Sequence, residues 1–164
     1  MSMQMPRFQD ILLLVGQLNY TWTNTESLLI YLIAGLAKVD KETAIVIFLT
    51  LNTTRARIDL VERLAKMRKT PAARRREILD ITAELTQQGK LRNKYNHCIY
   101  SFDETGANGS TQLMRIFDAK DEIRYGKIEE LNDAELARVT QSIDEIGKIN
   151  KRIWKVVKEN AFPF

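Results

Sequence analysis

The chain has 164 residues, a length that suits one ordinary domain with a core that needs neither disulfides nor metal. A single cysteine, Cys98, and a single histidine, His97, exclude an internal disulfide framework and a Cys/His zinc cluster. The formal net charge is only +4, and 45% of the residues are hydrophobic, so extensive disorder is not expected. We therefore predict one domain over residues 1–164, with no metal or other cofactor.

The first 70 residues or so predict two long helices. Apolar residues recur every three or four positions over residues 8–38, and the stretch 28–37 is apolar on all sides. Such a stretch is either core or a subunit contact. Asp40 is placed to cap a second helix over about 41–69, and the polar residues 52–54 favour a kink within it.

A third helix is predicted to begin at Thr70-Pro71, with threonine as the cap and proline in the first turn. It runs to about Gln88, and Gly89 either ends it or is tolerated inside it. A further helical stretch covers about residues 90–98.

Residues 99–129 break the helical pattern. Strand-forming residues alternate there with turn-forming ones, and the stretch 103–110 has the composition of a turn. We expect a small antiparallel hairpin or three-stranded meander in this segment.

Asn132 and Glu135 form a capping-box pattern, which predicts a last helix to about Glu159. The expected fold is therefore mainly α, a helical bundle of four to five long helices with the small β segment inserted at about 99–129.

The N-terminal residues lack the basic and apolar regions of a signal peptide, and the longest apolar run, at 28–37, has only ten residues. We expect a cytoplasmic protein without a membrane partner.

The positive charge is concentrated in residues 55–76, which we call the basic segment. It holds nine basic and two acidic side chains, a net charge of +7, whereas residues 1–54 carry −1 and residues 77–164 carry −2. A phosphate backbone attracts such a segment through charge and counterion release, and a solvated corner between two helices is the alternative interpretation. The segment has no aromatic residue on which bases could stack. The residues that we assign to nucleic-acid binding are Arg68, Lys69, Arg74, Arg75 and Arg76.

One motif carries chemistry, the run Arg92-Asn93-Lys94-Tyr95-Asn96-His97. Arg92 and His97 are five residues apart and so lie about 140° apart around an ideal helix. Asn93 and His97 are four apart and share a face, so Asn93 is placed to hold the imidazole in one tautomer. The run resembles the Arg-(four to six residues)-His signature of the HEPN superfamily, which often has a polar residue directly after the arginine.

The resemblance implies a helical-bundle homodimer with metal-independent endoribonuclease chemistry, in which Arg92, Asn93 and His97 are the catalytic residues. His97 would act as base or acid, and Arg92 would stabilise the charge that develops on the phosphate. One chain with one histidine cannot supply two imidazoles, but two copies can. The partners implied are RNA, a second copy and, as for the toxin members of the family that act in defence or stress, an antitoxin protein. The toxin branch often has tyrosine two residues after the histidine, where this sequence has Ile99.

Two other interpretations stay open. In the first, the chain is a non-catalytic helical dimerisation or interaction module. In the second, it is a nonspecific nucleic-acid binder that uses the basic segment. In the structural interpretation of the motif, His97, Cys98 and Tyr100 pack at a helix end, and Arg92 pairs with a carboxylate such as Glu84.

Overall fold

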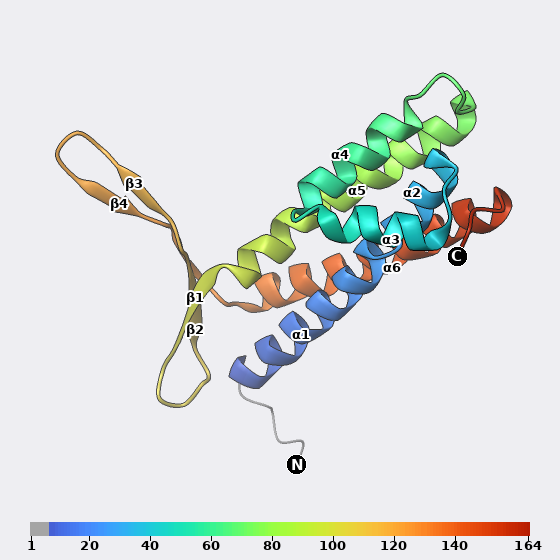
Figure 1. The fold of residues 1–164 in the computed structure, drawn as a ribbon. Coiled ribbons are helices and arrows are strands. Elements are labelled where there is room, and N and C mark those ends of the chain that lie inside the picture. The colour runs from blue at the N-terminus through green and yellow to red at the C-terminus, as the bar shows by residue number, and fades with distance from the viewer. Residues whose placement is uncertain (1–6) are drawn as a thin grey trace, which may run out of the picture. The chain divides into compact units, whose positions relative to one another are not determined.

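The computed structural model describes residues 7–164, which form six helices and five strands (Figure 1). The helices are α1 (Arg7–Glu26), α2 (Leu29–Ala37), α3 (Lys41–Thr50), α4 (Thr54–Ala65), α5 (Ala72–Asn96) and α6 (Asp133–Glu159). The strands lie between α5 and α6 and are β1 (Cys98–Phe102), β2 (Gly109–Leu113), β3 (Ile116–Asp118), β4 (Ile123–Tyr125) and β5 (Ile128–Glu130). The predicted fold class, mainly α with a small antiparallel β insertion, is confirmed.

The chain divides by its contacts into two compact units, each built from segments that are distant in the sequence. Unit 1 combines the chain up to Tyr20 with Lys90–Ile143, and unit 2 combines Thr21–Gly89 with Asp144–Phe164. The boundary falls within α1, α5 and α6. The single domain predicted from the sequence stays a prediction.

The helix expected over residues 8–38 is in fact two helices, because the chain turns between Glu26 and Leu29. The Ser27 hydroxyl donates a hydrogen bond to the carbonyl of Asn24 at 2.9 Å, an alternative to the regular helix. The apolar stretch 28–37 is core of unit 2, not a surface for a partner. Its buried side chains in α2 are Leu29, Leu32, Ile33, Ala34 and Leu36.

The helix expected over residues 41–69 is also two helices, α3 and α4. Asp40 caps α3 as predicted, since its carboxylate accepts from the backbone N–H of Thr43 at 2.7 Å, and this bond lowers the pKa of Asp40. Thr53 caps α4 in the same way, accepting from the N–H of Ala56 at 3.1 Å. The polar residues 52–54 therefore break the helix rather than kink it, because a second cap can begin a new one.

The third helix is longer than expected, since α5 continues through Gly89 to Asn96. Gly89 lies against Trp22 in unit 2, where an added β-carbon would come within 2.9 Å of the indole ring. The glycine therefore allows close packing instead of ending the helix. The Thr70 hydroxyl, expected to cap this helix, donates to the carbonyl of Leu64 at 3.4 Å instead.

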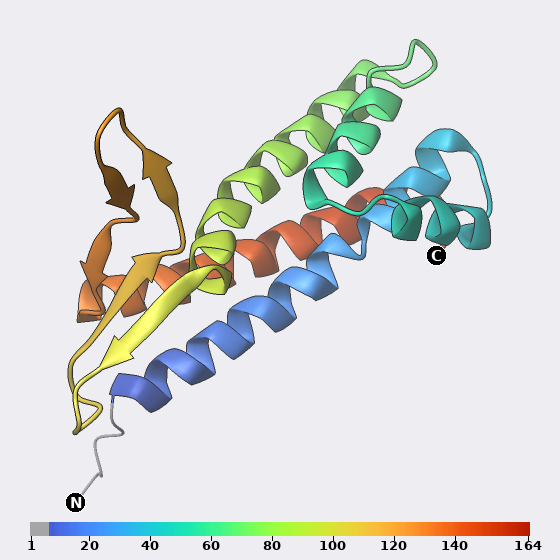
Figure 2. The same cartoon turned by 60° about the vertical axis from the view of Figure 1, so that its left-hand side comes forward.

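The inserted segment of unit 1 has two sheets rather than a single hairpin or meander. β2 lies between β1 and β5 in a three-stranded antiparallel sheet, and β3 and β4 form a separate antiparallel hairpin (Figure 2). β1 lies beside the start of α1, where the rings of Phe8 and Phe102 meet edge to face at 5.1 Å (Figure 2). The turn after β1 is the predicted one, with Gly106 at a φ of 71°.

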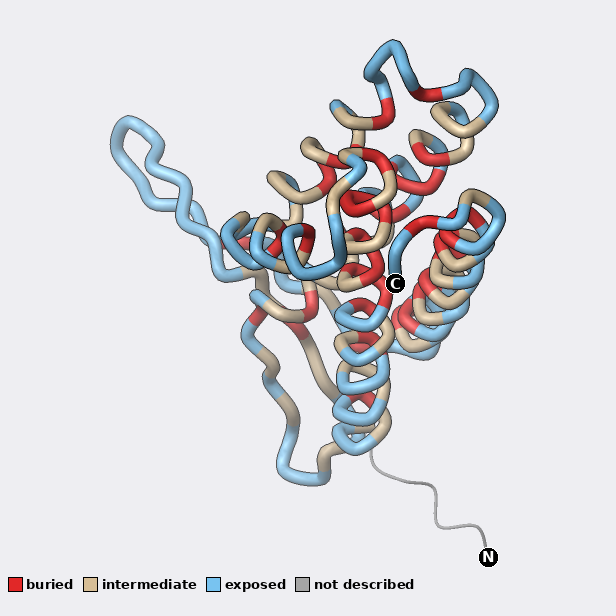
Figure 3. The backbone as a smooth tube through the Cα atoms, turned by 45° about the vertical axis from the view of Figure 1, so that its right-hand side comes forward, coloured by how far each residue is buried: buried red, intermediate tan, exposed pale blue. Residues whose placement is uncertain are grey.

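The two sheets differ in how far they are buried. Alternate residues of a strand face opposite sides, and Cys98 and Thr111 are buried on one side of the three-stranded sheet while Ile99 and Ile128 are exposed on the other. The β3–β4 hairpin is exposed along its whole length (Figure 3). No helix in residues 7–164 combines the length and apolar content that crossing a membrane requires.

Candidate functional site

The Arg92–His97 motif lies in unit 1, where α5 meets the sheet. The backbone N–H of His97 donates to the carbonyls of Asn93 and Lys94 at 3.1 and 3.3 Å and closes the last turn of α5. The carbonyl of His97 accepts from the backbone N–H of Met114 at 3.2 Å, just after β2. His97 therefore joins the helix to the sheet, and its side chain is exposed.

The side chains of Arg92 and Asn93 contact each other. Arg92 Nη1 donates to Asn93 Oδ1 at 3.0 Å, and Arg92 is half-buried. The expected hydrogen bond from Asn93 to the imidazole of His97 is not formed among the described residues. Glu84, the expected carboxylate partner of Arg92, instead pairs with Arg152 at 2.7 Å. The structure thus joins a guanidinium to an amide and leaves the imidazole open to solvent.

Cys98 and Tyr100 pack at the end of α5, as the structural interpretation of the motif predicted. The Tyr100 hydroxyl donates to the carbonyl of Tyr95 at 2.6 Å, and the Cys98 thiol lies 3.7 Å from the same oxygen. Burial raises the pKa of the Cys98 thiol and of the Tyr100 phenol. Both groups are therefore protonated at neutral pH, which does not suit a nucleophile.

A largely buried polar network includes Lys94 and Tyr95 in the middle of the motif, and it was not predicted from the sequence. Lys94 Nζ pairs with Glu129 at 2.6 Å and with Glu135 at 3.0 Å. The Tyr95 hydroxyl donates to Glu135 at 2.7 Å, and Arg138 pairs with the same carboxylate at 2.8 Å. These bonds engage Lys94, so it is not a free cation for a substrate.

The network shifts the pKa values of its members in opposite directions. Burial acts to lower the pKa of Lys94, but the hydrogen bonds and charges of Glu129 and Glu135 outweigh it and raise that pKa. Burial acts to raise the pKa of Glu135, but hydrogen bonds from Tyr95 and Lys94 lower it overall. Burial and Glu135 together raise the pKa of Tyr95.

Glu135 is the one member of this network that the sequence analysis singled out for a role of its own. Asn132 caps α6 as predicted, accepting from the N–H of Glu135 at 3.0 Å. The carboxylate of Glu135 is used by Lys94 and Tyr95, which precede it by 41 and 40 residues. The capping-box pattern therefore marked the residue, and only the fold reveals its partners.

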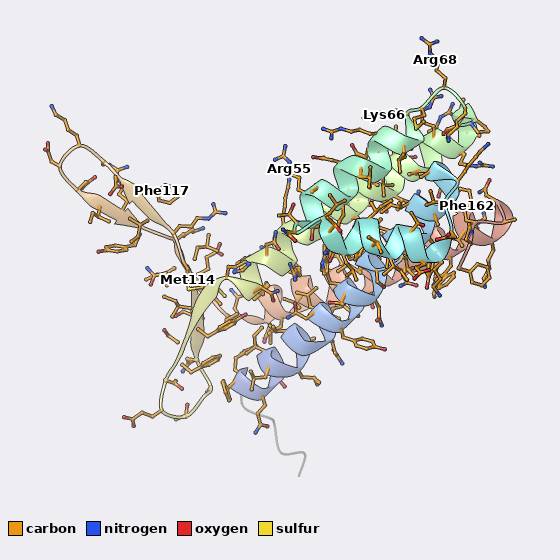
Figure 4. All side chains as sticks on the ribbon, in the orientation of Figure 1. Arg55, Lys66, Arg68, Met114, Phe117 and Phe162 are labelled. Carbon is orange, nitrogen blue, oxygen red and sulfur yellow. The ribbon has the colours of Figure 1, made fainter. Side chains whose placement is uncertain are left out.

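The basic segment lies in unit 2, on α4, the loop after it and the start of α5. Figure 4 shows Arg55, Lys66 and Arg68 projecting outwards from α4 and this loop. Among the five residues assigned to nucleic-acid binding, Arg68, Lys69 and Arg76 are exposed. These three side chains are therefore open to solvent.

Three other basic side chains of the segment serve the fold. The Arg74 guanidinium lies over the ring of Phe162 at 5.4 Å, and Arg75 donates to the carbonyl of Thr70 at 3.1 Å. Arg57 pairs with the largely buried carboxylate of Glu26 at 3.1 Å. Fewer basic side chains are therefore available to a ligand than the nine counted in the sequence. Arg74 and Arg75 are weaker candidates for nucleic-acid binding than Arg68, Lys69 and Arg76.

A groove of about 470 Å³ opens on the inserted segment next to the motif. Its lining residues are Ile99, Gln112, Leu113, Met114, Arg115, Ile116 and Tyr125. The bond between the backbones of His97 and Met114 connects this groove to the motif. Within residues 7–164, no three His, Cys, Asp or Glu side chains gather as a metal-binding group.

No model of a known protein family matches this chain, and neither curated proteins nor solved structures give a match. The resemblance to the HEPN superfamily therefore depends on the motif and its position at the end of a long helix.

Proposed function

We propose that this protein is a HEPN-like, metal-independent endoribonuclease that acts as a homodimer. The observation that carries the proposal is the exposed imidazole of His97 directly after α5, with Arg92 and Asn93 on the last turns of the same helix. The side chain of a histidine used for packing would be buried or hydrogen-bonded, and the His97 imidazole is exposed and has no hydrogen bond to the described residues.

The reaction uses the 2′-hydroxyl of RNA as the nucleophile. A base removes the hydroxyl proton, the oxygen attacks the adjacent phosphorus, and the bond to the 5′-oxygen breaks as an acid protonates that oxygen. The products are a 2′,3′-cyclic phosphate and a free 5′-hydroxyl. His97 exchanges one of the two protons, and a second copy of the chain supplies the other imidazole. Arg92 donates hydrogen bonds to the phosphate oxygens and stabilises their developing charge.

The exposed cations of the basic segment contribute affinity for RNA rather than sequence choice. Arg68, Lys69 and Arg76 would neutralise phosphates and release counterions, so binding weakens as salt rises. Reversing these three charges to glutamate should weaken RNA binding and flatten its salt dependence. Fluorescence anisotropy with labelled single-stranded RNA at several salt concentrations measures both effects.

The decisive experiment compares His97→Ala with the wild type on single-stranded RNA in the presence of a chelator. Loss of a general acid or base should lower the cleavage rate by about 10²- to 10⁴-fold. Gln87→Ala is the matched control, since Gln87 is an exposed side chain on α5, ten residues before His97. Circular dichroism verifies that both variants fold. Unchanged cleavage by His97→Ala, or no cleavage by the wild type, overturns the enzymatic proposal.

A toxin role in the cytoplasm, held in check by an antitoxin protein, belongs to the same proposal. The second candidate is a non-catalytic interaction module. The hydrogen bond between Arg92 and Asn93 favours it, because each side chain already has a partner in the absence of a substrate. This candidate predicts that wild type and His97→Ala are equally inactive on RNA.

A further inference from the structure

The inserted segment of unit 1 exposes a continuous apolar surface. Ile99 and Ile128 face the same side of the three-stranded sheet, since both flank Gln112 in the register. Ile116 and Tyr125 pair across the hairpin and line the same groove as Ile99. We call this set of residues the apolar β surface. Its members are Ile99, Met114, Ile116, Ile123, Tyr125 and Ile128, each between 50% and 66% exposed.

The size of this surface suits a stable protein contact. A half-exposed side chain of this kind leaves on the order of 100 Å² in water, so six leave about 600 Å². That is the upper end of the largest apolar patch on an ordinary monomer, about 300–600 Å². With its polar rim, the surface approaches the roughly 800 Å² that each partner buries in a standard interface.

The hairpin gives a second reason to expect a partner. β3 and β4 have three residues each, and all six are exposed. A lone two-stranded hairpin is marginally stable in water, so its apolar side needs a cover. Figure 4 shows Met114 at the base of this hairpin and Phe117 along it.

The charges around the surface indicate which partner fits. Residues 115–130 carry four basic and five acidic side chains, and close pairs such as Arg124–Glu122, at 2.7 Å, mix the two signs. A polyanion such as RNA requires an excess of positive charge, which is absent here. A twofold interface requires a surface that complements itself, and a patch of mixed, nearly balanced charge can meet its own copy without net repulsion.

We infer that the apolar β surface is the contact through which two copies of this chain form a dimer. The sequence offers the stretch 28–37 as a possible subunit contact. In the structure this stretch is core of unit 2, so another surface has to form the dimer contact.

The dimer would also bring the two motifs to one interface. His97 and Ile99 are two residues apart where β1 begins, both are exposed, and the buried Cys98 between them faces the other side. His97 therefore directly precedes the strand whose exposed side would meet the partner. This consequence rests on the proposed function, whereas the contact itself rests on the apolar surface alone.

The first test is sedimentation velocity of the full chain between about 1 and 100 µM. We expect the wild type to dimerise in this range. Ile116→Glu should raise the dissociation constant by about 100-fold or more, since it buries an unpaired charge. Leu49→Glu is the matched control, because Leu49 on α3 is 64% exposed and Ile116 is 65% exposed. Circular dichroism verifies folding, and Ile128→Glu repeats the test on the other sheet.

The second test is a cross-link. Met114→Cys places a thiol on the surface, and mild oxidation should join two chains through it, whereas Leu49→Cys should not. A wild type that is monomeric at every concentration overturns the inference. So does a dimer that Leu49→Glu disrupts and Ile116→Glu leaves intact.

The two proposals fail separately. A dimer that Ile116→Glu disrupts, in a protein that cleaves no RNA, upholds the contact and overturns the endoribonuclease. An Ile116→Glu monomer that cleaves RNA at the wild-type rate upholds RNA cleavage by this chain, but it overturns both the two-imidazole mechanism and the pairing of the motifs at the interface.

Discussion

α2 and the apolar β surface are both rich in large aliphatic side chains, and the fold treats them in opposite ways. α2 buries Leu29, Leu32 and Ile33 completely, whereas Ile116 and Ile123 of the hairpin are more than half exposed. The two regions belong to different units, and their large aliphatic side chains differ in how far neighbouring elements cover them.

The cover of α2 comes from elements of its own unit. α3 and α4 pack on α2, and the ring of Phe162 lies against Gly35 so closely that an added β-carbon would come within 2.0 Å of it. The hairpin has strands of three residues, each with two apolar side chains and one charged side chain, and no described helix encloses it. An apolar segment thus becomes core only where the chain provides neighbours for all its faces.

The largest expected effect tests this difference directly. Leu32→Ala should lower the free energy of unfolding by about 2–5 kcal/mol, because it leaves a cavity in a packed core. Ile123→Ala should cost under about 0.5 kcal/mol when measured by urea denaturation at a concentration where the chain is monomeric. Equal losses of unfolding free energy in the two variants would mean that other parts of the same chain cover the hairpin. That result would contradict the contrast between a buried α2 and an exposed hairpin.

A pair of glycines sharpens the same point within unit 2. Gly35→Ala should cost about 1–3 kcal/mol of unfolding free energy, because the new methyl group must displace Phe162. Gly147 on α6 has nothing within 4 Å of an added β-carbon, so Gly147→Ala should stabilise by about 0.5–1 kcal/mol through helix propensity. Thermal denaturation of the two variants should therefore give shifts of opposite sign.

The polar network of unit 1 contrasts with the apolar packing of unit 2 through its pH dependence. Glu135→Gln should cost about 1–3 kcal/mol at neutral pH, since Lys94 and Tyr95 lose a charged acceptor. The folded-state pKa values of Glu129 and Glu135 are lowered, so their contribution is complete above the ordinary carboxylate range and is lost as the pH falls through the folded values. The raised pKa of Lys94 limits its own contribution only at alkaline pH.

Urea denaturation at several pH values measures this effect. The difference between wild type and Glu135→Gln should narrow in acid, whereas Glu130→Gln, at an exposed position of β5, should match the wild type throughout. A difference that stays constant down to strongly acidic pH would show that the charge of Glu135 is not what the network uses.

The sequence predicted the parts of the fold that depend on local chemistry. Asp40 and Asn132 cap helices because a side-chain oxygen three residues before a free N–H needs no distant partner. The same reasoning missed that Thr53 would end one helix and begin another, since the residues allow either a kink or a break. It also read Gly89 as an end or a tolerated residue, because the contact with Trp22 that decides the matter comes from α1.

The candidate site divides along the same line. The motif Arg92–His97 was visible in the sequence, and so was the excess charge of the basic segment. The sequence did not show that Arg74 contacts Phe162, or that Lys94 pairs with Glu129 and Glu135. Those contacts join residues that are 35 to 88 positions apart. Whether a cation is free for a ligand is a tertiary property, and no count of charges supplies it.

The smallest expected effect concerns the helix caps, where the two units should behave alike. Thr53→Ala in unit 2 and Asn132→Ala in unit 1 should each cost about 1 kcal/mol of unfolding free energy, because each leaves one backbone N–H without its acceptor. Hydrogen exchange should speed up at Ala56 in the first variant and at Glu135 in the second. If Asn132→Ala costs several times more unfolding free energy than Thr53→Ala, the cap also positions the Glu135 carboxylate for Lys94. The hydrogen bond from Glu135 N–H to Asn132 would then be part of the polar network.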